Sequence, residues 1–170
     1  MMIWPIRFPF GNYYDYIERG YEELHKEEQE KKIEILKKYV IVKPEEKLLD
    51  VGCGTGLTTI PWECKRYGID PARKLLERAW KPLEVEYKKA RAERIPYPDH
   101  YFDWVISVTA IQNFSNLKKG LKEIKRVGKE RFALTALKRS WRIRLIEEAI
   151  REIFQVKEVI EEEKDLIFII

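Results

Sequence analysis

An acidic residue followed by three alternating glycines is the part of this sequence best suited to bind a ligand. Asp50 precedes Gly52, Gly54 and Gly56, directly after a short apolar run. Glycine tolerates positive φ and has no Cβ, so a ligand can approach the backbone of such a turn closely. A carboxylate at this point suits a cationic group, such as the ammonium of an amino acid, better than an anion. The alternative is a tight turn that holds no ligand.

A second acidic residue, Asp70, ends the next apolar run and is followed by Pro71. A carboxylate at the end of a strand can accept hydrogen bonds from both hydroxyls of a ribose. Together with Asp50, it implies a ligand with an amino-acid end and a nucleoside end. Asp70 could instead cap a helix that starts near Pro71.

Two other kinds of site are disfavoured by the residues present. A dinucleotide fingerprint would need glycine at position 57, where the chain has Leu57. The chain has two cysteines and two histidines, too few and too scattered in sequence for a metal site or a Ser-His-Asp arrangement. We therefore expect no metal and disfavour a nicotinamide cofactor.

Strand and helix patterns alternate over most of the chain, which predicts an α/β fold with an open, mostly parallel sheet and helices on both faces. Ligands bind beyond the carboxyl ends of the strands of such sheets, which is where the glycine turn and Asp70 lie. Strands are expected at 47–51, 67–70, 83–90, 104–111, 131–137, 155–161 and 165–170, and helices at 17–39, after the glycine turn, and at 71–81, 115–127 and 140–154.

Several segments, in order, resemble one known family. Residues 48–56, Leu-Leu-Asp-Val-Gly-Cys-Gly-Thr-Gly, resemble motif I of the class I S-adenosylmethionine-dependent methyltransferases, of the methyltransferase domain 11 type. Residues 68–71 are similar to the next motif, whose acidic residue holds the ribose. Residues 90–99 are similar to the third motif, and residues 101–107 to the entry of strand four. The resemblance spans about residues 47–135 well and the C-terminal strand pair more weakly.

The resemblance implies the Rossmann-like fold of that family, with a seven-stranded, mostly parallel sheet of order 3-2-1-4-5-7-6 whose last strand is antiparallel. It implies a single domain over residues 1–170, with the sheet core at 41–170. Residues 1–40 would form an N-terminal aromatic and helical lid over the pocket. The aromatic residues near the N-terminus could instead be a hydrophobic latch on the edge of the sheet.

The implied cofactor is S-adenosyl-L-methionine, which leaves as S-adenosyl-L-homocysteine. Because Arg91 stands where the family often has an aspartate near the adenine, Glu93 or the backbone at Ala92 would take that role, although Glu93 could also be a solvated loop charge. Methyl transfer needs mainly alignment of nucleophile and methyl, so no catalytic base is nominated. The expected cofactor contacts are Asp50, Gly52, Cys53, Gly54, Gly56, Asp70, Pro71, Ala92, Glu93, Thr109 and Gln112.

The methyl acceptor is not readable from the sequence, and a small molecule and RNA both stay open. Residues 118–144 hold eleven basic and two acidic residues, which indicates either a solvated helix face or a footprint for an anionic substrate. An aromatic side chain among cations there could stack on a base. Candidate substrate-rim residues are Tyr13, Tyr16, Tyr21, Asn113, Arg139, Trp141 and Arg142.

Composition bounds the remaining possibilities. The chain is 36% charged, has only three Gln and three Asn, and carries a net charge of +4, a pattern typical of heat-adapted proteins. It has no apolar run near the roughly 20 residues of a membrane span, and residues 1–10 do not read as a secretory signal. We therefore expect a cytoplasmic protein without membrane contact, of undetermined oligomeric state. A non-catalytic cofactor-binding or partner protein of the same fold is the main alternative function, and an NAD-dependent oxidoreductase is less favoured.

Overall fold

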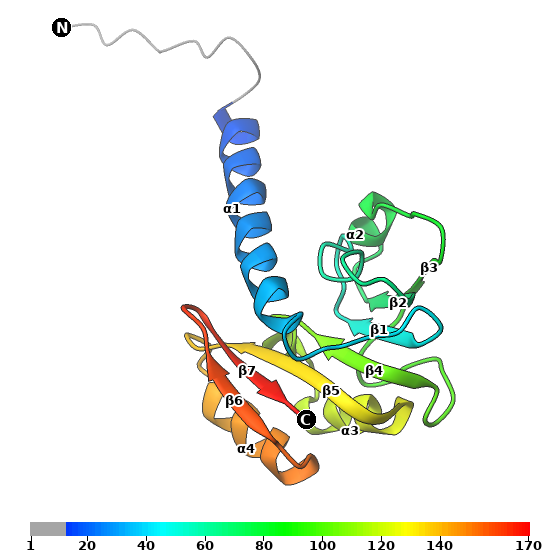
Figure 1. The fold of residues 1–170 in the computed structure, drawn as a ribbon. Helices are drawn as coiled ribbons and strands as arrows, with labels where there is room; N and C mark the ends of the chain where they lie inside the picture. Colours follow the sequence, from blue (N-terminus) through cyan, green and yellow to red (C-terminus); the bar gives the residue numbers. More distant parts are fainter. Residues whose placement is uncertain (1–12) are drawn as a thin grey trace, which may run out of the picture.

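A seven-stranded sheet organises the chain, and its order confirms the predicted one (Figure 1). The computed structural model describes residues 13–170, with side chains from residue 23 onward. β7 runs antiparallel to the other six strands of the sheet, and the order is β3-β2-β1-β4-β5-β7-β6. The strands are β1 (Lys47–Val51), β2 (Lys65–Asp70), β3 (Val85–Lys89), β4 (Phe102–Ser107), β5 (Gly128–Leu137), β6 (Glu158–Glu161) and β7 (Asp165–Ile169).

The helices lie on both faces of the sheet, as predicted, although their bounds differ from those read from the sequence. Asn116, rather than the neighbouring Ser115, caps the third α-helix, because its side chain accepts a hydrogen bond from the Lys119 amide. The helices are α1 (Tyr13–Leu36), α2 (Arg73–Arg78), the 3₁₀ turn η1 (Ile111–Asn113), α3 (Leu117–Val127) and α4 (Ile143–Ile153).

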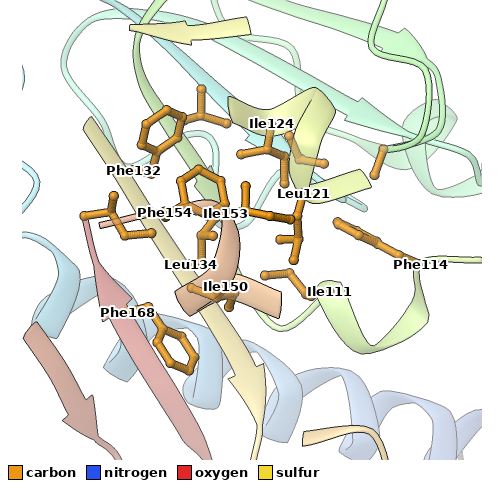
Figure 2. Packing of buried hydrophobic residues seen from close by; sticks show 14 of the residues in the cluster. Ile111, Phe114, Leu121, Ile124, Phe132, Leu134, Ile150, Ile153, Phe154 and Phe168 are labelled. Carbon is orange, nitrogen blue, oxygen red and sulfur yellow. The ribbon is translucent and has the colours of Figure 1, made fainter. Parts of the chain in front are cut away.

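One face of the sheet is covered by α3 and α4, whose apolar stripes repeat every three or four residues. Leu121 and Ile124 of α3 and Ile150 of α4 are fully buried there. They pack with aromatic side chains from β5 and β7, among them Phe132 and Phe168 (Figure 2). The central strands β1, β4 and β5 are nearly continuous in burial, as expected for parallel strands covered on both faces.

The opposite face is covered differently, because the helix expected after the glycine turn is absent. Residues 52–64 form a series of turns instead. Pro61 opposes a helix in this short connection, and Trp62 folds back so that its indole N–H donates to the Thr58 carbonyl at 2.8 Å. The buried Trp62 ring and the last turns of α1, with Ile33 and Leu36, fill the space that a helix would occupy.

Helix α1 stands on this second face and extends beyond the sheet (Figure 1). Its C-terminal turns are anchored by apolar packing. Further toward its N-terminus, His25, Lys26 and Gln29 line a cavity at the edge of the sheet. The helix therefore forms a wall beside the carboxyl ends of the central strands.

Candidate functional site

The main cavity lies where the chain leaves β1, β2 and β4, at the carboxyl edge of the sheet. Its volume is about 940 Å³, at the upper end of the range for small-molecule sites. Such edges are where open α/β sheets bind ligands. The sequence-predicted residues that line it are Gly52, Cys53, Gly54, Asp70, Pro71, Ala92, Glu93, Thr109 and Asn113.

The three glycines of the turn all adopt positive φ, but for different reasons. A Cβ at Gly52 would lie 2.4 Å from Ala110 Cβ, and one at Gly56 would lie 2.2 Å from the Tyr87 hydroxyl. These two glycines are therefore required by packing within the chain, and Gly56 does not line the cavity. A Cβ at Gly54 (φ +55°) would come no closer than 3.8 Å to a neighbouring atom, on Leu75. Gly54 is thus the position where the backbone is open toward a ligand.

Asp50 lies behind the turn rather than on the cavity wall. Its carboxylate is fully buried, and Oδ2 accepts hydrogen bonds from the hydroxyls of Thr58 at 2.6 Å and Thr59 at 2.7 Å. Its Oδ1 has no hydrogen-bond partner among the described residues. Burial raises the pKa of Asp50 to about 6, against the two hydroxyl hydrogen bonds that lower it. Asp50 Oδ1 is therefore able to accept a further hydrogen bond.

Asp70 is at the cavity and is also part of the local backbone structure. Its Oδ2 accepts the Gly54 N–H at 2.9 Å, and its Oδ1 accepts the Ala72 N–H at 2.8 Å. The alternative prediction that Asp70 caps a helix is wrong, because α2 begins at Arg73 and its N-cap, Ala72, has no side-chain cap; Asp70 closes the turn before the helix instead. A carboxylate has about four acceptor sites, so two backbone bonds leave capacity for ligand hydroxyls. The bond to Gly54 also ties the glycine turn to the end of β2.

The third predicted motif forms another wall of the cavity. Ala92 is buried, while Glu93 is half-buried and accepts the Asn116 N–H at 2.9 Å. Glu93 therefore accepts a hydrogen bond from a backbone N–H at the start of α3. The alternative prediction, a solvated loop charge, does not include this bond. Arg91 also lines the cavity and donates to the Ser115 hydroxyl at 3.1 Å.

The turn after β4 contains a strained residue. Thr109 has φ +53°, a conformation that is uncommon for a β-branched residue and costs about 1–3 kcal/mol. Its N–H donates to the Thr135 hydroxyl at 2.8 Å, and its own hydroxyl donates to Asp165 at 2.7 Å. Gln112, predicted to contact the cofactor, does not line the cavity; its amide donates to the Thr109 carbonyl at 2.7 Å. Gln112 therefore supports the turn from outside the cavity.

The predicted substrate rim divides into residues with different surroundings. Arg142 donates to the carbonyl oxygens of Gln112 at 3.1 Å and Phe114 at 2.7 Å, so its guanidinium supports the segment after β4. Trp141 is 86% exposed and Arg139 is exposed, and neither lines the cavity. Tyr13, Tyr16 and Tyr21 lie in the first turns of α1, where only the backbone is described.

The cavity also includes residues that sequence reasoning missed. One face of α1 contributes three polar side chains, and α2 with the following turn contributes apolar ones. A spacing of three or four residues on a predicted helix was the available signal for the first group. The Gln29 amide oxygen is buried without a hydrogen-bond partner among the described residues. The missed residues include His25, Lys26, Gln29, Leu75, Arg78 and Trp80.

The chemistry of the cavity does not include an activated thiol or a cluster of metal ligands. Burial raises the pKa of the Cys53 thiol, and nearby Asp50 and Asp70 add to that shift. The thiol is therefore protonated and unreactive near neutral pH. Among the side chains described, from residue 23 onward, no group of three or more His, Cys, Asp and Glu is placed to hold a metal ion.

Comparison with known proteins agrees with this geometry. A family model described as a methyltransferase domain matches residues 49–132. The uncharacterized methyltransferase YcgJ of Bacillus subtilis is 32% identical over 95 residues, covering 51% of this chain and 38% of the relative. The structure of a SAM-dependent methyltransferase from Aquifex aeolicus superposes with a TM-score of 0.66 at 24% identity, covering 80% of this chain and 86% of that chain. The cyclase SpnF shares the fold with a TM-score of 0.68 at 20% identity, covering 76% of this chain and 58% of that chain.

These findings define the class of protein. Residues 49–132 match the methyltransferase domain family, and the chain has the fold of the S-adenosylmethionine-dependent methyltransferases. It spans less than half the length of the curated relatives it matches. In the part of the chain that the structure describes, no helix is long and apolar enough to cross a membrane.

Proposed function

We propose that the chain transfers a methyl group from S-adenosylmethionine to a small acceptor. The observation that carries this proposal is a cavity of about 940 Å³ at the carboxyl edge of the sheet, bounded by the open turn at Gly54 and by Asp70. Bound S-adenosylmethionine supplies an electrophilic methyl on a sulfonium. Asp70 has acceptor capacity for ribose hydroxyls, and Asp50 offers an unpartnered buried oxygen to an ammonium or to a water that bridges to it.

The residues of the chain act mainly by alignment in this proposal. Positioning of the nucleophile against the methyl lowers the barrier without a general base. The turn after β4, which carries Thr109, and the wall from α1, which carries Gln29, lie on the same cavity. We propose that the acceptor enters between them.

We also propose that residues 41–170 are the sheet core of a single domain and that the part of residues 1–40 before the anchored turns of α1 is the lid.

Calorimetric titration tests the cofactor assignment directly. We expect S-adenosylmethionine and S-adenosylhomocysteine to bind with dissociation constants in the micromolar range, about −8 kcal/mol, and NAD not to bind. Leu57 in place of the third fingerprint glycine supports the exclusion of NAD. Binding of NAD alone would reject the proposal in favour of an oxidoreductase.

Asp70→Ala should weaken the binding of S-adenosylhomocysteine by about tenfold or more. The substitution removes the ribose acceptor and also the bond that holds the Gly54 N–H. Asp70→Asn is the matched variant, because its amide oxygen keeps one acceptor while the charge is lost. Titration of both variants checks the prediction, and an affinity equal to that of the wild type in Asp70→Ala would remove Asp70 from the site.

The alternative is a cofactor-binding protein of this fold that does not methylate. The fold by itself does not require methyl transfer, because the cyclase SpnF shares it. Formation of S-adenosylhomocysteine from S-adenosylmethionine separates the two functions when it is followed with a low-molecular-mass cell fraction and, in parallel, with total transfer RNA. Binding without turnover in either mixture would favour the non-catalytic function.

A small acceptor is favoured over RNA because much of the basic segment 118–144 is already engaged. Arg126 pairs with Glu123 and Asp99, and Lys138 pairs with Glu161. Arg142 is held by backbone carbonyls. The exposed Trp141 and Arg139 are features of this segment that still favour RNA. Turnover with the transfer RNA fraction alone would reverse this preference.

We also propose that the protein is cytoplasmic and heat-adapted. A cytoplasmic location fits a chain whose described helices include no membrane span. Heat adaptation fits its charge content and its few amides. Thermal unfolding above about 90 °C would support heat adaptation.

A further inference from the structure

A buried polar cluster lies directly under the cavity and joins four parts of the fold. Lys32 of α1 is 1% exposed, and its Nζ lies 3.2 Å from Asp165 Oδ1 at the start of β7. The same ammonium donates to the Thr109 hydroxyl at 2.9 Å. Thr135 of β5 donates to Asp165 Oδ2 at 2.8 Å. The cluster thus connects α1, the turn after β4, β5 and β7.

Such a cluster is not explained by stability alone. Removing two charges from water is expensive, and well-packed apolar residues often replace buried ion pairs without loss of stability. Buried pairs of this kind can instead select one arrangement among several. Here Asp165 Oδ2 accepts hydrogen bonds from the hydroxyls of Thr109 at 2.7 Å and Thr135 at 2.8 Å. Asp165 Oδ1 has no hydrogen bond among the described residues and faces the Lys32 ammonium as an ion pair at 3.2 Å. The cluster is therefore expected to select one conformation of the chain segments that surround it.

The arrangement that depends on the cluster is the strained turn at Thr109. Both the N–H and the hydroxyl of Thr109 are bonded into the cluster, by Thr135 and Asp165 respectively. The next residue, Ala110, packs against the first glycine of the turn so closely that a Cβ at Gly52 would meet it at 2.4 Å. Positive φ at Thr109 therefore sets how the end of β4 meets the glycine turn.

The same cluster also fixes the wall of the cavity that α1 provides. Lys32 lies one turn from Gln29 along the helix, and Gln29 lines the cavity while Lys32 is buried beneath it. Toward its N-terminus the helix extends away from the sheet (Figure 1). Lys32 is thus a buried polar anchor close to the cavity-facing part of the helix, in addition to Glu28, which pairs with Lys164 in the turn before β7.

We infer that Lys32, Thr135 and Asp165 are positioning residues, which hold the Thr109 turn and the α1 wall in the conformation that binds the cofactor. The inference rests on the proposed function, since the cavity is the one assigned above to S-adenosylmethionine. None of the three residues lines the cavity.

Thr135→Val is the sharpest test, because valine has the shape of threonine and lacks only the hydroxyl that accepts the Thr109 N–H. We expect S-adenosylhomocysteine to bind about tenfold more weakly to Thr135→Val by calorimetry, and within about threefold of the wild type to Thr135→Ser. Ile150→Ala, in α4 beneath the other face of the sheet, is the control for general destabilisation. It should lower the melting temperature and leave the affinity unchanged.

Unchanged affinity in Thr135→Val, or an equal loss in Ile150→Ala, would overturn the inference. Hydrogen exchange without ligand decides it even if the wild type fails to bind S-adenosylhomocysteine, an outcome that would reject the proposed function alone. In Thr135→Val and Lys32→Met, the Thr109 amide and those of residues 25–32 should exchange about tenfold faster or more, with those of α4 unaffected. Equal acceleration everywhere, or none at Thr109, would show that the cluster has no positioning role.

Discussion

Gly54→Asn should weaken S-adenosylhomocysteine binding by about 30-fold or more, while the protein stays folded. Asparagine is one of the few residues that adopts positive φ readily, so the +55° backbone of Gly54 is retained at small cost. The added Cβ meets only Leu75, at 3.8 Å, an ordinary contact. The loss of affinity would then come from the side chain that occupies the approach to the backbone, rather than from a damaged turn.

The other two glycines show why position 54 is the informative one. A Cβ at Gly52 or Gly56 would collide with Ala110 or with the Tyr87 hydroxyl. Substitution there would disturb the fold, and weakened binding would have no clear cause. Gly54 separates the two effects, because its neighbours leave space that only a ligand would fill.

Calorimetry and thermal unfolding on the same preparations check this prediction. The matched control is His100→Asn, which places the same residue at another position of positive φ (+53°), at the start of β4 and away from the cavity. It should keep the affinity of the wild type. If Gly54→Asn binds as tightly as the wild type, the ligand does not approach the turn, and the glycine there serves the backbone alone.

The sheet order could be predicted because its signals are local and ordered along the chain. Each strand ends at a recognisable feature, such as the glycine turn after Val51 or Asp70 at the end of β2. The family resemblance supplied the order in which these strands pair. Local patterns did not predict that the helix after the glycine turn is absent. Trp62 and the C-terminal turns of α1 replace that helix through contacts between distant segments.

The site was predictable to the extent that its residues follow strand ends. Gly54 and Asp70 are at the cavity for that reason. Arg142, by contrast, is predicted from sequence as a substrate-rim residue, and only the fold shows that its guanidinium bonds the carbonyl oxygens of Gln112 and Phe114. Lys32 reads as part of a charged helix, and its partner Asp165 lies near the other end of the chain. Pairs this far apart cannot be inferred from one sequence.

The pH dependence of the unfolding free energy should identify Asp50 as a buried carboxylate with a raised pKa. Burial raises its pKa from 3.8 to about 6 in the folded protein. The folded state therefore binds this proton more tightly than the unfolded state does. The contribution of Asp50 to stability is greatest below about pH 4 and is lost as the pH rises through about 6, by up to about 3 kcal/mol.

Asp50→Asn isolates this contribution from that of other carboxylates. The amide has the shape of the carboxylate, and its oxygen can still accept hydrogen bonds from Thr58 and Thr59. The unfolding free energy of Asp50→Asn minus that of the wild type should grow between about pH 4 and about pH 7. Glu123→Gln should change in the opposite sense, because the hydrogen bond from Arg126 lowers the pKa of Glu123 in the folded state. Urea unfolding across this range measures both differences.

Binding should respond to the same proton in the opposite direction from stability. Only an ionised Asp50 attracts an ammonium, and a cation near its unpartnered Oδ1 would offset the cost of burying the charge. The affinity of the wild type for S-adenosylhomocysteine should therefore rise by about tenfold between about pH 5 and about pH 7. The affinity of Asp50→Asn should be lower at about pH 7 and nearly flat over this range. An equally steep rise in the variant would mean that another group titrates, and that Asp50 serves the turn through its threonines and not the ligand.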